Sequence, residues 1–233
     1  MNDRIRLSCI IPAYNEGPRI GAVLAAALAA PEIDEVIVVD DGSTDETADV
    51  VAQWQRRARK LRILSQPDNI GKSRAVAAGV GSARGHVLML IDSDLVGLRA
   101  QHLSRLAAPV LHGRAGAAIS LRGNAPKSWR LIGLDYISGE RVMPRRLLAD
   151  RLEELDSLPR FGLEVFMNRL WLDEHLKIAV VPWPDVASPM KAEKRGGFVP
   201  GVRADLAMLR DMFKTVSPVA ALGQILAMRL RRV

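Results

Sequence analysis

The sequence predicts an α/β fold with a mostly parallel, Rossmann-like sheet flanked by helices. Short apolar runs recur along the first half of the chain, and such uninterrupted runs are typical of strands buried on both faces. Stretches with helical spacing of apolar residues lie between them, so strand and helix alternate. This alternation predicts parallel strands with helices on both faces of the sheet.

The elements of the first half follow one another in a regular order. Pro12 ends a first strand because proline cannot donate to a ladder, and the next segment has apolar residues at helical spacing. Ser43 and Glu46 have the spacing of a capping box, which predicts that a helix starts there. The expected order is strand 7–11, helix 17–30, strand 36–39, helix from Ser43, strand 61–64, helix 73–83 and strand 87–91.

The second half of the chain has a looser pattern. The elements that we expect there are helix 101–111, strand 115–121, a loop around 138–141, helix 162–175 and strand 178–181. After Pro182-Trp183-Pro184 the chain becomes basic and partly helical. We therefore predict one domain over 1–185, with a first half 1–112 and a second half 113–185, followed by a tail over 186–233.

The tail carries most of the net charge of +7. Nine Lys and Arg residues stand against three acids in 186–233, which suggests an anionic partner such as a phosphate or a membrane surface. At helical spacing the last residues form one apolar stripe: Val219, Leu222, Leu226, Leu230 and Val233. This stripe suits an anionic bilayer, or packing against the body or against a second subunit of a homo-oligomer.

The composition excludes some functions. Aromatic residues make up 4% of the chain, which argues against a nucleic-acid-binding protein that stacks on bases. Cys9 is the single cysteine, so an internal disulfide is impossible and a reducing, cytoplasmic location is favoured. The longest helical apolar stretch, 23–30, is too short to span a bilayer. We expect a cytoplasmic protein, and the basic tail leaves peripheral attachment to the inner face of the membrane open.

Two carboxylates follow the strand 87–91. Asp92 and Asp94 stand one residue apart with Ser93 between them, where ligands gather in open α/β sheets. Carboxylates at this position suit Mg²⁺ or Mn²⁺ held against a diphosphate, although Asp and Ser also favour simple turns.

Three other predicted strands also end in polar clusters. These clusters are 12–16, 40–43 and 69–72. Tyr14 suits a nucleotide base, Lys72 suits a phosphate, and carboxylates suit base N–H groups and ribose hydroxyls. The sequence contains neither a P-loop nor a Gly-x-Gly-x-x-Gly turn after the first strand. Together the clusters predict a polar pocket for a nucleoside diphosphate and a metal ion.

Three motifs resemble family 2 glycosyltransferases of the GT-A fold over residues 6–185. They are Ile10-Ile11-Pro12-Ala13-Tyr14-Asn15-Glu16, Val38-Val39-Asp40-Asp41-Gly42-Ser43-Thr44 and Ile91-Asp92-Ser93-Asp94. The resemblance implies a UDP- or GDP-sugar donor and a divalent metal ion, Mg²⁺ or Mn²⁺. It implies that Asp94 is the main metal ligand, that Asp92 contacts ribose or metal, and that Ser93 belongs to the donor site. The residues implied to contact the base and ribose are Pro12, Tyr14, Glu16, Val39 and Asp41.

Segments of the second half resemble two branches of this family. Ser138-Gly139-Glu140-Arg141, Arg160-Phe161-Gly162-Leu163-Glu164 and a basic stretch with Lys191, Lys194 and Arg195 are similar to dolichol- or polyprenol-phosphate sugar synthases. Glucosyl-3-phosphoglycerate synthases carry similar Ile-Asp-Ser-Asp-Leu, Ser-Gly-Glu and Gly-x-Glu segments. The sequence departs once from each branch. Val96 stands where the lipid enzymes commonly have a polar residue. No histidine lies between Pro184 and Met190, where the phosphoglycerate enzymes have one.

The acceptor is predicted from charge. Arg122 and Arg141 suit phosphate clamps, and Glu164 suits either a base or the N-terminus of its own helix, with Glu140 a weaker candidate for the base. A phosphate acceptor is already ionised and requires positioning more than a base. We therefore expect a phosphate-bearing acceptor, with a lipid phosphate ahead of phosphoglycerate. A non-catalytic scaffold that binds sugar nucleotides is the alternative.

Overall fold

The computed structural model describes residues 6–158, 162–189 and 216–233. The strands are β1 (Leu7–Ala13), β2 (Ile33–Asp41), β3 (Leu61–Gln66), β4 (Val87–Leu90), β5 (Ala117–Arg122), β6 (Arg141–Pro144) and β7 (Ile178–Trp183). They form one seven-stranded sheet in the order β3-β2-β1-β4-β6-β5-β7. Only the pairings of β6, with β4 and with β5, are antiparallel. The predicted mostly parallel α/β sheet is therefore confirmed.

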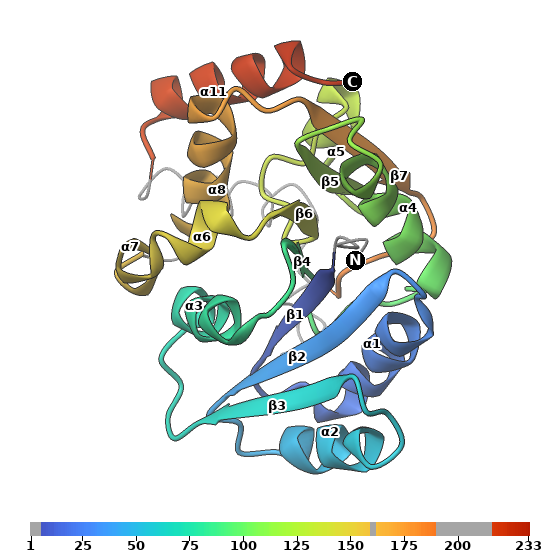
Figure 1. Ribbon diagram of the computed structural model, residues 1–233. Helices are drawn as coiled ribbons and strands as arrows, with labels where there is room; N and C mark the ends of the chain where they lie inside the picture. The colour runs from blue at the N-terminus through green and yellow to red at the C-terminus, as the bar shows by residue number, and fades with distance from the viewer. Residues whose placement is uncertain (1–5, 159–161, 190–215) are drawn as a thin grey trace, which may run out of the picture.

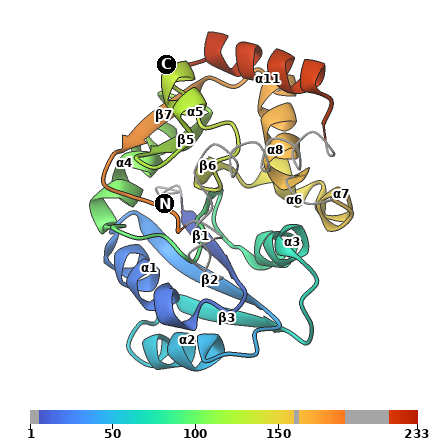
Figure 2. The same ribbon diagram turned by 180° about the vertical axis from the view of Figure 1, so that it is seen from behind.

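Helices cover both faces of this sheet (Figures 1 and 2). The helices are α1 (Gly17–Ala29), α2 (Thr47–Gln55), α3 (Lys72–Ser82), α4 (Ala100–Leu111), α5 (Lys127–Ile132), α6 (Arg146–Ala149), α7 (Leu152–Asp156), α8 (Gly162–Asp173) and α11 (Pro218–Leu230). One apolar core lies between the sheet and α1, α2 and α4. A second core joins the sheet to α3, α5, α6, α7, α8 and α11.

All six predicted strands are present, and their carboxyl ends differ from the predicted ends by at most two residues. The predicted loop at 138–141 is only partly correct, because Arg141 begins the short strand β6. The predicted N-cap at Ser43 is wrong. Helix α2 begins at Thr47, whose backbone N–H donates to the Asp45 carboxylate (2.9 Å), while Ser43 Oγ accepts from the backbone N–H of Asn15. Ser43 therefore joins two loops instead of capping a helix.

Helix α11 packs on the body of the molecule. Ala221, Ile225 and Met228 are buried in the core that α11 shares with α8, and the Tyr136 hydroxyl donates to Gln224 Oε1 (2.7 Å). The chain then pairs Val233 N–H with the carbonyl of Ile178 beside β7. No helix in the described ranges has the length and apolar character required to cross a membrane. The predicted boundary between domain and tail stays a prediction.

Candidate active site

The parallel strands bring three of the predicted polar clusters to one edge of the sheet. β1 lies between β2 and β4 in parallel register, so their carboxyl ends point the same way. The cluster 12–16 follows β1, 40–43 ends β2, and Asp92 and Asp94 follow β4. The crevice outside these carboxyl ends is where α/β sheets bind ligands.

Side chains of the first two loops interlock. Asn15 adopts a left-handed backbone conformation (φ 53°), and its Oδ1 accepts from the backbone N–H of Thr44 (2.8 Å). The backbone N–H of Glu16 donates to Thr47 Oγ1 (2.9 Å). Asparagine tolerates this backbone conformation better than most residues. The hydrogen bond from Thr44 to Asn15 therefore joins the loop after β1 to the loop after β2.

A cavity of about 400 Å³ opens at these loops. Tyr14 is 44% exposed there, which leaves its ring free to lie against a flat ligand. The Asp41 carboxylate accepts from the backbone N–H groups of Ile70 (3.0 Å) and Gly71 (2.9 Å), so it fixes the loop before α3. The predicted donor-site residues that line the cavity are Pro12, Tyr14, Glu16, Asp41, Lys72, Asp92, Ser93 and Asp94.

Val39 does not line this cavity. Its side chain is fully buried in the core between the sheet and α3, so the predicted contact with base or ribose does not involve that side chain. The strand alternates its side chains between faces, and Val39 points to the face that α3 covers.

Lys72 joins the two halves of the site. Its ammonium lies 2.8 Å from Asp92 Oδ1, which follows β4, and 3.1 Å from Glu164 Oε1 on α8. Loss of hydration works to lower the pKa of Lys72, but the two carboxylates outweigh it and raise the pKa, so the lysine stays protonated. A fixed positive charge therefore stands beside the predicted metal-binding pair.

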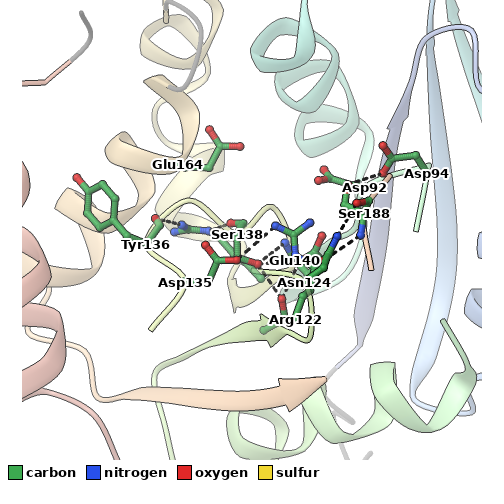
Figure 3. A network of polar contacts seen from close by, with 12 residues as sticks. Asp92, Asp94, Arg122, Asn124, Asp135, Tyr136, Ser138, Glu140, Glu164 and Ser188 are labelled. Atoms are coloured by element: carbon green, nitrogen blue, oxygen red, sulfur yellow. Dashed lines mark hydrogen bonds and ion pairs between the residues drawn. The ribbon is translucent and has the colours of Figure 1, made fainter. Parts of the chain in front are cut away.

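Asp94 contacts a residue from the other half of the chain. Ser188 Oγ donates to Asp94 Oδ1 (3.4 Å), and Asn124 holds Ser188 through its Nδ2, which donates to the Ser188 carbonyl (2.7 Å), and its Oδ1, which accepts from the Ser188 N–H (3.3 Å; Figure 3). Neither Asn124 nor Ser188 belongs to a motif, so sequence reasoning missed both. They become neighbours only because β5 and β7 pair.

The oxygens at this point suit a hard divalent cation. Two carboxylates and a hydroxyl are the kinds of ligand that Mg²⁺ and Mn²⁺ accept. In the described ranges, no group of three or more His, Cys, Asp or Glu side chains is arranged to hold a metal ion. An ion held by these few oxygens would take its remaining ligands from a diphosphate and from water, which Mg²⁺ usually does.

A second cavity, of about 740 Å³, adjoins the first. Both are lined by Gly71, Lys72, Asp92 and Asp94, so they meet at the predicted metal site. The walls of the second cavity combine cationic, apolar and acidic side chains, the acids being Asp92, Asp94, Asp156 and Glu164. Its cationic residues are Lys72, Arg74 and Arg122, and its apolar residues are Ile70, Ile137, Leu158, Leu163 and Pro189.

Arg122 is held by two buried carboxylates. Its Nη2 donates to Asp135 Oδ2 (3.3 Å), and its Nε lies 3.5 Å from Glu140 Oε2 (Figure 3). Glu140 Oε2 also accepts from the hydroxyls of Ser120 (2.6 Å) and Ser138 (2.7 Å). Burial raises the pKa of Asp135 and of Glu140, and Arg122 opposes that rise. This network fixes the guanidinium at the cavity wall.

A family model described as "Glycosyl transferase family 2" matches residues 8–176. The chain belongs to glycosyl transferase family 2. This finding confirms the resemblance that the motifs indicated.

Curated relatives of this chain include lipid-phosphate enzymes. The chain is 39% identical over 94 residues to a dolichyl-phosphate beta-glucosyltransferase of Trichomonas vaginalis, a match that covers 36% of this chain and 28% of the relative. It is 38% identical over 96 residues to a dodecaprenyl-phosphate galacturonate synthase of Rhizobium johnstonii, covering 39% of this chain and 28% of the relative. The chain thus matches less than a third of the length of either relative.

A solved structure confirms the GT-A fold. Glucosyl-3-phosphoglycerate synthase of Mycobacterium tuberculosis, in complex with Mn²⁺, UDP-glucose and phosphoglyceric acid, superposes on this chain with a TM-score of 0.68. The superposition covers 95% of this chain and 80% of the other, at 22% identity. At 22% identity the superposition shows that the two proteins share a fold.

The structure corrects the prediction for Arg141. Its side chain is fully buried and donates to the carbonyls of Ser138 (2.7 Å) and Tyr136 (3.0 Å) and to Asn168 Oδ1 (2.6 Å). The guanidinium lies 4.9 Å from the centre of the Trp171 ring, and burial lowers its pKa to about 10. Arg141 lines neither cavity, so the predicted phosphate clamp does not fit this placement; the residue ties β6 to α8.

The two glutamates of the second half take different positions. Glu164 lies in the first turn of α8, is almost fully buried, and lines the second cavity beside Lys72. Glu140 is fully buried behind Arg122 and lines neither cavity. Arg160, Phe161, Lys191, Lys194 and Arg195 lie outside the described residues, so their predicted roles stay predictions.

Proposed function

We propose that this chain transfers a sugar from a nucleoside diphosphate sugar to a phosphate-bearing acceptor, with a polyprenyl phosphate as that acceptor. The observation that carries the proposal is the meeting of two cavities at Asp92, Asp94 and Lys72. One cavity offers polar groups suited to a nucleotide, and the other offers Arg74 and Arg122 beside apolar walls, with its acids Asp92 and Glu164 paired with Lys72. Transfer requires donor and acceptor to meet at one reactive centre, which this arrangement allows.

The donor side fits a UDP- or GDP-sugar. The ring of Tyr14 is exposed for a base, and Glu16 and Asp92 offer oxygens for N–H groups and ribose hydroxyls. Asp94, supported by Ser188, and Asp92 would hold Mg²⁺ or Mn²⁺. When bound, such an ion supplies Lewis-acid stabilisation of the departing diphosphate. Lys72 adds a fixed positive charge beside that leaving group.

The acceptor side fits an anionic head with an apolar chain. Arg122 presents a rigidly held cation to the cavity, while Ile137, Leu158 and Leu163 offer an apolar wall. A phosphate oxygen is already ionised at neutral pH, so attack on the sugar requires no general base. Glu164 is paired with Lys72 and would position that lysine rather than remove a proton. The names of the lipid-phosphate relatives support this acceptor.

A small soluble acceptor is the second candidate. The superposition with a glucosyl-3-phosphoglycerate synthase favours it, since a phosphate of either source would meet the same arginine. The departure at 184–190, where histidine is absent, speaks against it. A non-catalytic scaffold is disfavoured because both aspartates and the lysine beside them are intact. A peripheral position at an anionic membrane surface is part of the proposal, and the predicted cytoplasmic location and homo-oligomer stay predictions.

Transfer from labelled donors tests the proposal. The protein is incubated with UDP- and GDP-sugars and Mn²⁺ or Mg²⁺, with either a polyprenyl phosphate in detergent or 3-phosphoglycerate as acceptor. We expect label in the organic phase with the lipid acceptor and none with phosphoglycerate. Label only in a water-soluble product would select the second candidate. Donor binding detected as a thermal shift without any transfer would select the scaffold.

A further inference from the structure

The exposed apolar side chains of the described residues gather at one end of the molecule. Of the nine large apolar residues that are exposed in the described ranges, four lie along α11 and a fifth, Val233, follows it. We call these five the apolar stripe: Val219, Leu222, Leu226, Leu230 and Val233. A sixth, Leu131 on α5, is 89% exposed. The end of α11 adjoins the end of α5, because Arg232 Nη1 donates to the Gly133 carbonyl (3.1 Å). A contiguous apolar patch on a soluble surface marks an interaction site.

The core does not require these side chains. The opposite side of α11 supplies the buried residues Ala221, Ile225 and Met228, which pack against the body. The stripe itself is between 53% and 88% exposed, with Leu226 the least exposed and Leu230 the most. The helix is therefore fixed on its inner side and presents leucines outward.

The two elements that carry the exposed apolar residues, α11 and α5, have charges of one sign. Residues 216–233 contain three arginines and no acid, and α5 adds Lys127 and Arg130 without an acid. Arg229, Arg130 and Lys127 are exposed. A long arginine side chain can lie along apolar surface and keep its charged end in the headgroup region. Leucines on a helix that carries cations and no acid match an anionic bilayer, whereas a second copy of the same face would bring like charges together. Acids are present at the adjoining end of α8, where Asp173 and Glu174 precede His175, the partner of Arg231.

We propose that the apolar stripe of α11, together with α5, is the surface on which this protein docks to an anionic membrane. The inference rests on the proposed function, because a lipid-linked acceptor lies in a bilayer, and it adds which face of the protein meets that bilayer. Leu222, Leu226 and Leu230 enter the interface, and Arg130 and Arg229 contact anionic headgroups.

Flotation with vesicles tests this surface directly and without an acceptor. Wild-type protein is mixed with phosphatidylcholine vesicles, with or without phosphatidylglycerol, and we expect flotation mainly with the anionic vesicles. The double variant Leu226→Glu/Leu230→Glu should bind about a hundredfold more weakly, since each leucine removed costs about tenfold. Arg130→Gln/Arg229→Gln should lose about fivefold per arginine, and only with the anionic vesicles.

A matched control lies at the other end of the molecule. Arg56 and Arg57 are exposed after α2, which lies opposite α11 in Figures 1 and 2. Arg56→Gln/Arg57→Gln changes the net charge equally and should float like the wild type. All altered side chains are exposed, so the thermal midpoint should stay within a few degrees of wild type. Equal loss in both arginine variants would show that net charge alone drives binding, which overturns the proposed surface.

Two further outcomes separate this inference from the proposed function. Transfer to a short, water-soluble prenyl phosphate should be unchanged in the leucine variant, while transfer to a vesicle-embedded acceptor falls. If the leucine variant floats like the wild type, the proposed docking surface is wrong, whatever the result of the transfer assay. A wild-type dimer in light scattering that becomes monomeric in the leucine variant, without any vesicle binding, would assign the stripe to a second copy instead.

Discussion

Ser188 Oγ lies 3.4 Å from Asp94 Oδ1, and Asn124 holds the Ser188 backbone through both its amide atoms. A residue that follows β7 thus orients the carboxylate that follows β4. Partners of metal ligands typically contribute about tenfold to a hundredfold to metal affinity. We therefore expect Ser188→Ala to weaken Mn²⁺ binding in the presence of UDP by about tenfold. Titration calorimetry measures the affinity.

Ser188→Thr is the matched control for this effect. It keeps the hydroxyl and should retain most of the affinity for Mn²⁺. Asn124→Ala should mimic Ser188→Ala, because it releases the backbone that places the hydroxyl. Equal Mn²⁺ affinity in Ser188→Ala and wild type would remove Ser188 from the metal site.

Asp94→Asn should abolish transfer without unfolding the protein. A Lewis acid contributes several kcal/mol to charge stabilisation, so we expect a loss of about 10³-fold or more in kcat. Asp94 is half-buried and lines both cavities, so the thermal midpoint without metal should change little. In wild type, Mn²⁺ with UDP should raise that midpoint, and in Asp94→Asn the rise should disappear. Wild-type turnover in the variant would exclude the metal role.

Much of this site could be predicted because parallel topology follows from local patterns. The motifs at 12–16, 40–43 and 92–94 end strands, and strands of a parallel sheet open on the same edge. Lys72, from the cluster 69–72, lines the cavity at that edge. These residues line the cavity because they follow the carboxyl ends of strands. The apolar runs in the sequence show where those strands end.

The remaining residues depend on contacts between distant segments. Arg141 has the same sequence context whether it faces solvent or not, and only its packing against Trp171 and Asn168 makes it a core residue. Ser188 reaches Asp94 because β7 pairs with β5, a pairing between segments far apart in sequence. The strand β6 has only four residues, too few for its alternation to stand out from a loop.

Lys72→Met should weaken donor binding and chemistry together. The ammonium is bonded to Asp92 and Glu164, and its loss leaves the almost fully buried Glu164 without this cation. A hydrogen bond to a charged group contributes about 1.5–3 kcal/mol, so we expect KM for the donor to rise by about tenfold or more. Steady-state kinetics with varied donor measures this change. Glu164→Gln, which keeps the lysine, should leave KM for the donor nearly unchanged; an equal rise in both variants would contradict a direct role for Lys72.

Arg122→Lys should weaken acceptor binding more than donor binding. Complete removal of the cation would leave Asp135 and Glu140 buried without it, at a cost of about 3–5 kcal/mol in stability, so alanine is a poor probe. Lysine keeps the charge but cannot present a fork of donors to a phosphate. We expect KM for the polyprenyl phosphate to rise by about tenfold, with KM for the donor unchanged. Arg74→Lys, on the same cavity but more exposed, is the control and should change KM for the acceptor less.

Glu35 should make stability depend on pH in the acid range. It lies near the amino end of β2, whereas Asp92 and Asp94 follow the carboxyl end of β4. Its carboxylate accepts from Ser8 Oγ (2.6 Å), the backbone N–H of Arg84 (2.6 Å) and Arg62 Nη2 (2.9 Å). Burial works to raise the pKa of Glu35, but these donors outweigh it and hold the pKa below its usual value.

A carboxylate with a lowered folded-state pKa stabilises the fold above its unfolded pKa. That contribution is lost as pH falls through the folded-state pKa. Glu35→Gln should therefore lower the free energy of unfolding by about 1–3 kcal/mol at neutral pH. The difference from wild type should shrink as pH falls below about 4, where the unfolded carboxylate begins to take up its proton. Urea unfolding over a pH series measures both values, and the exposed Glu153→Gln serves as control. If the difference in unfolding free energy between wild type and Glu35→Gln stays constant down to the lowest pH, the charge on Glu35 contributes nothing to stability. In that case only the geometry of its hydrogen bonds matters.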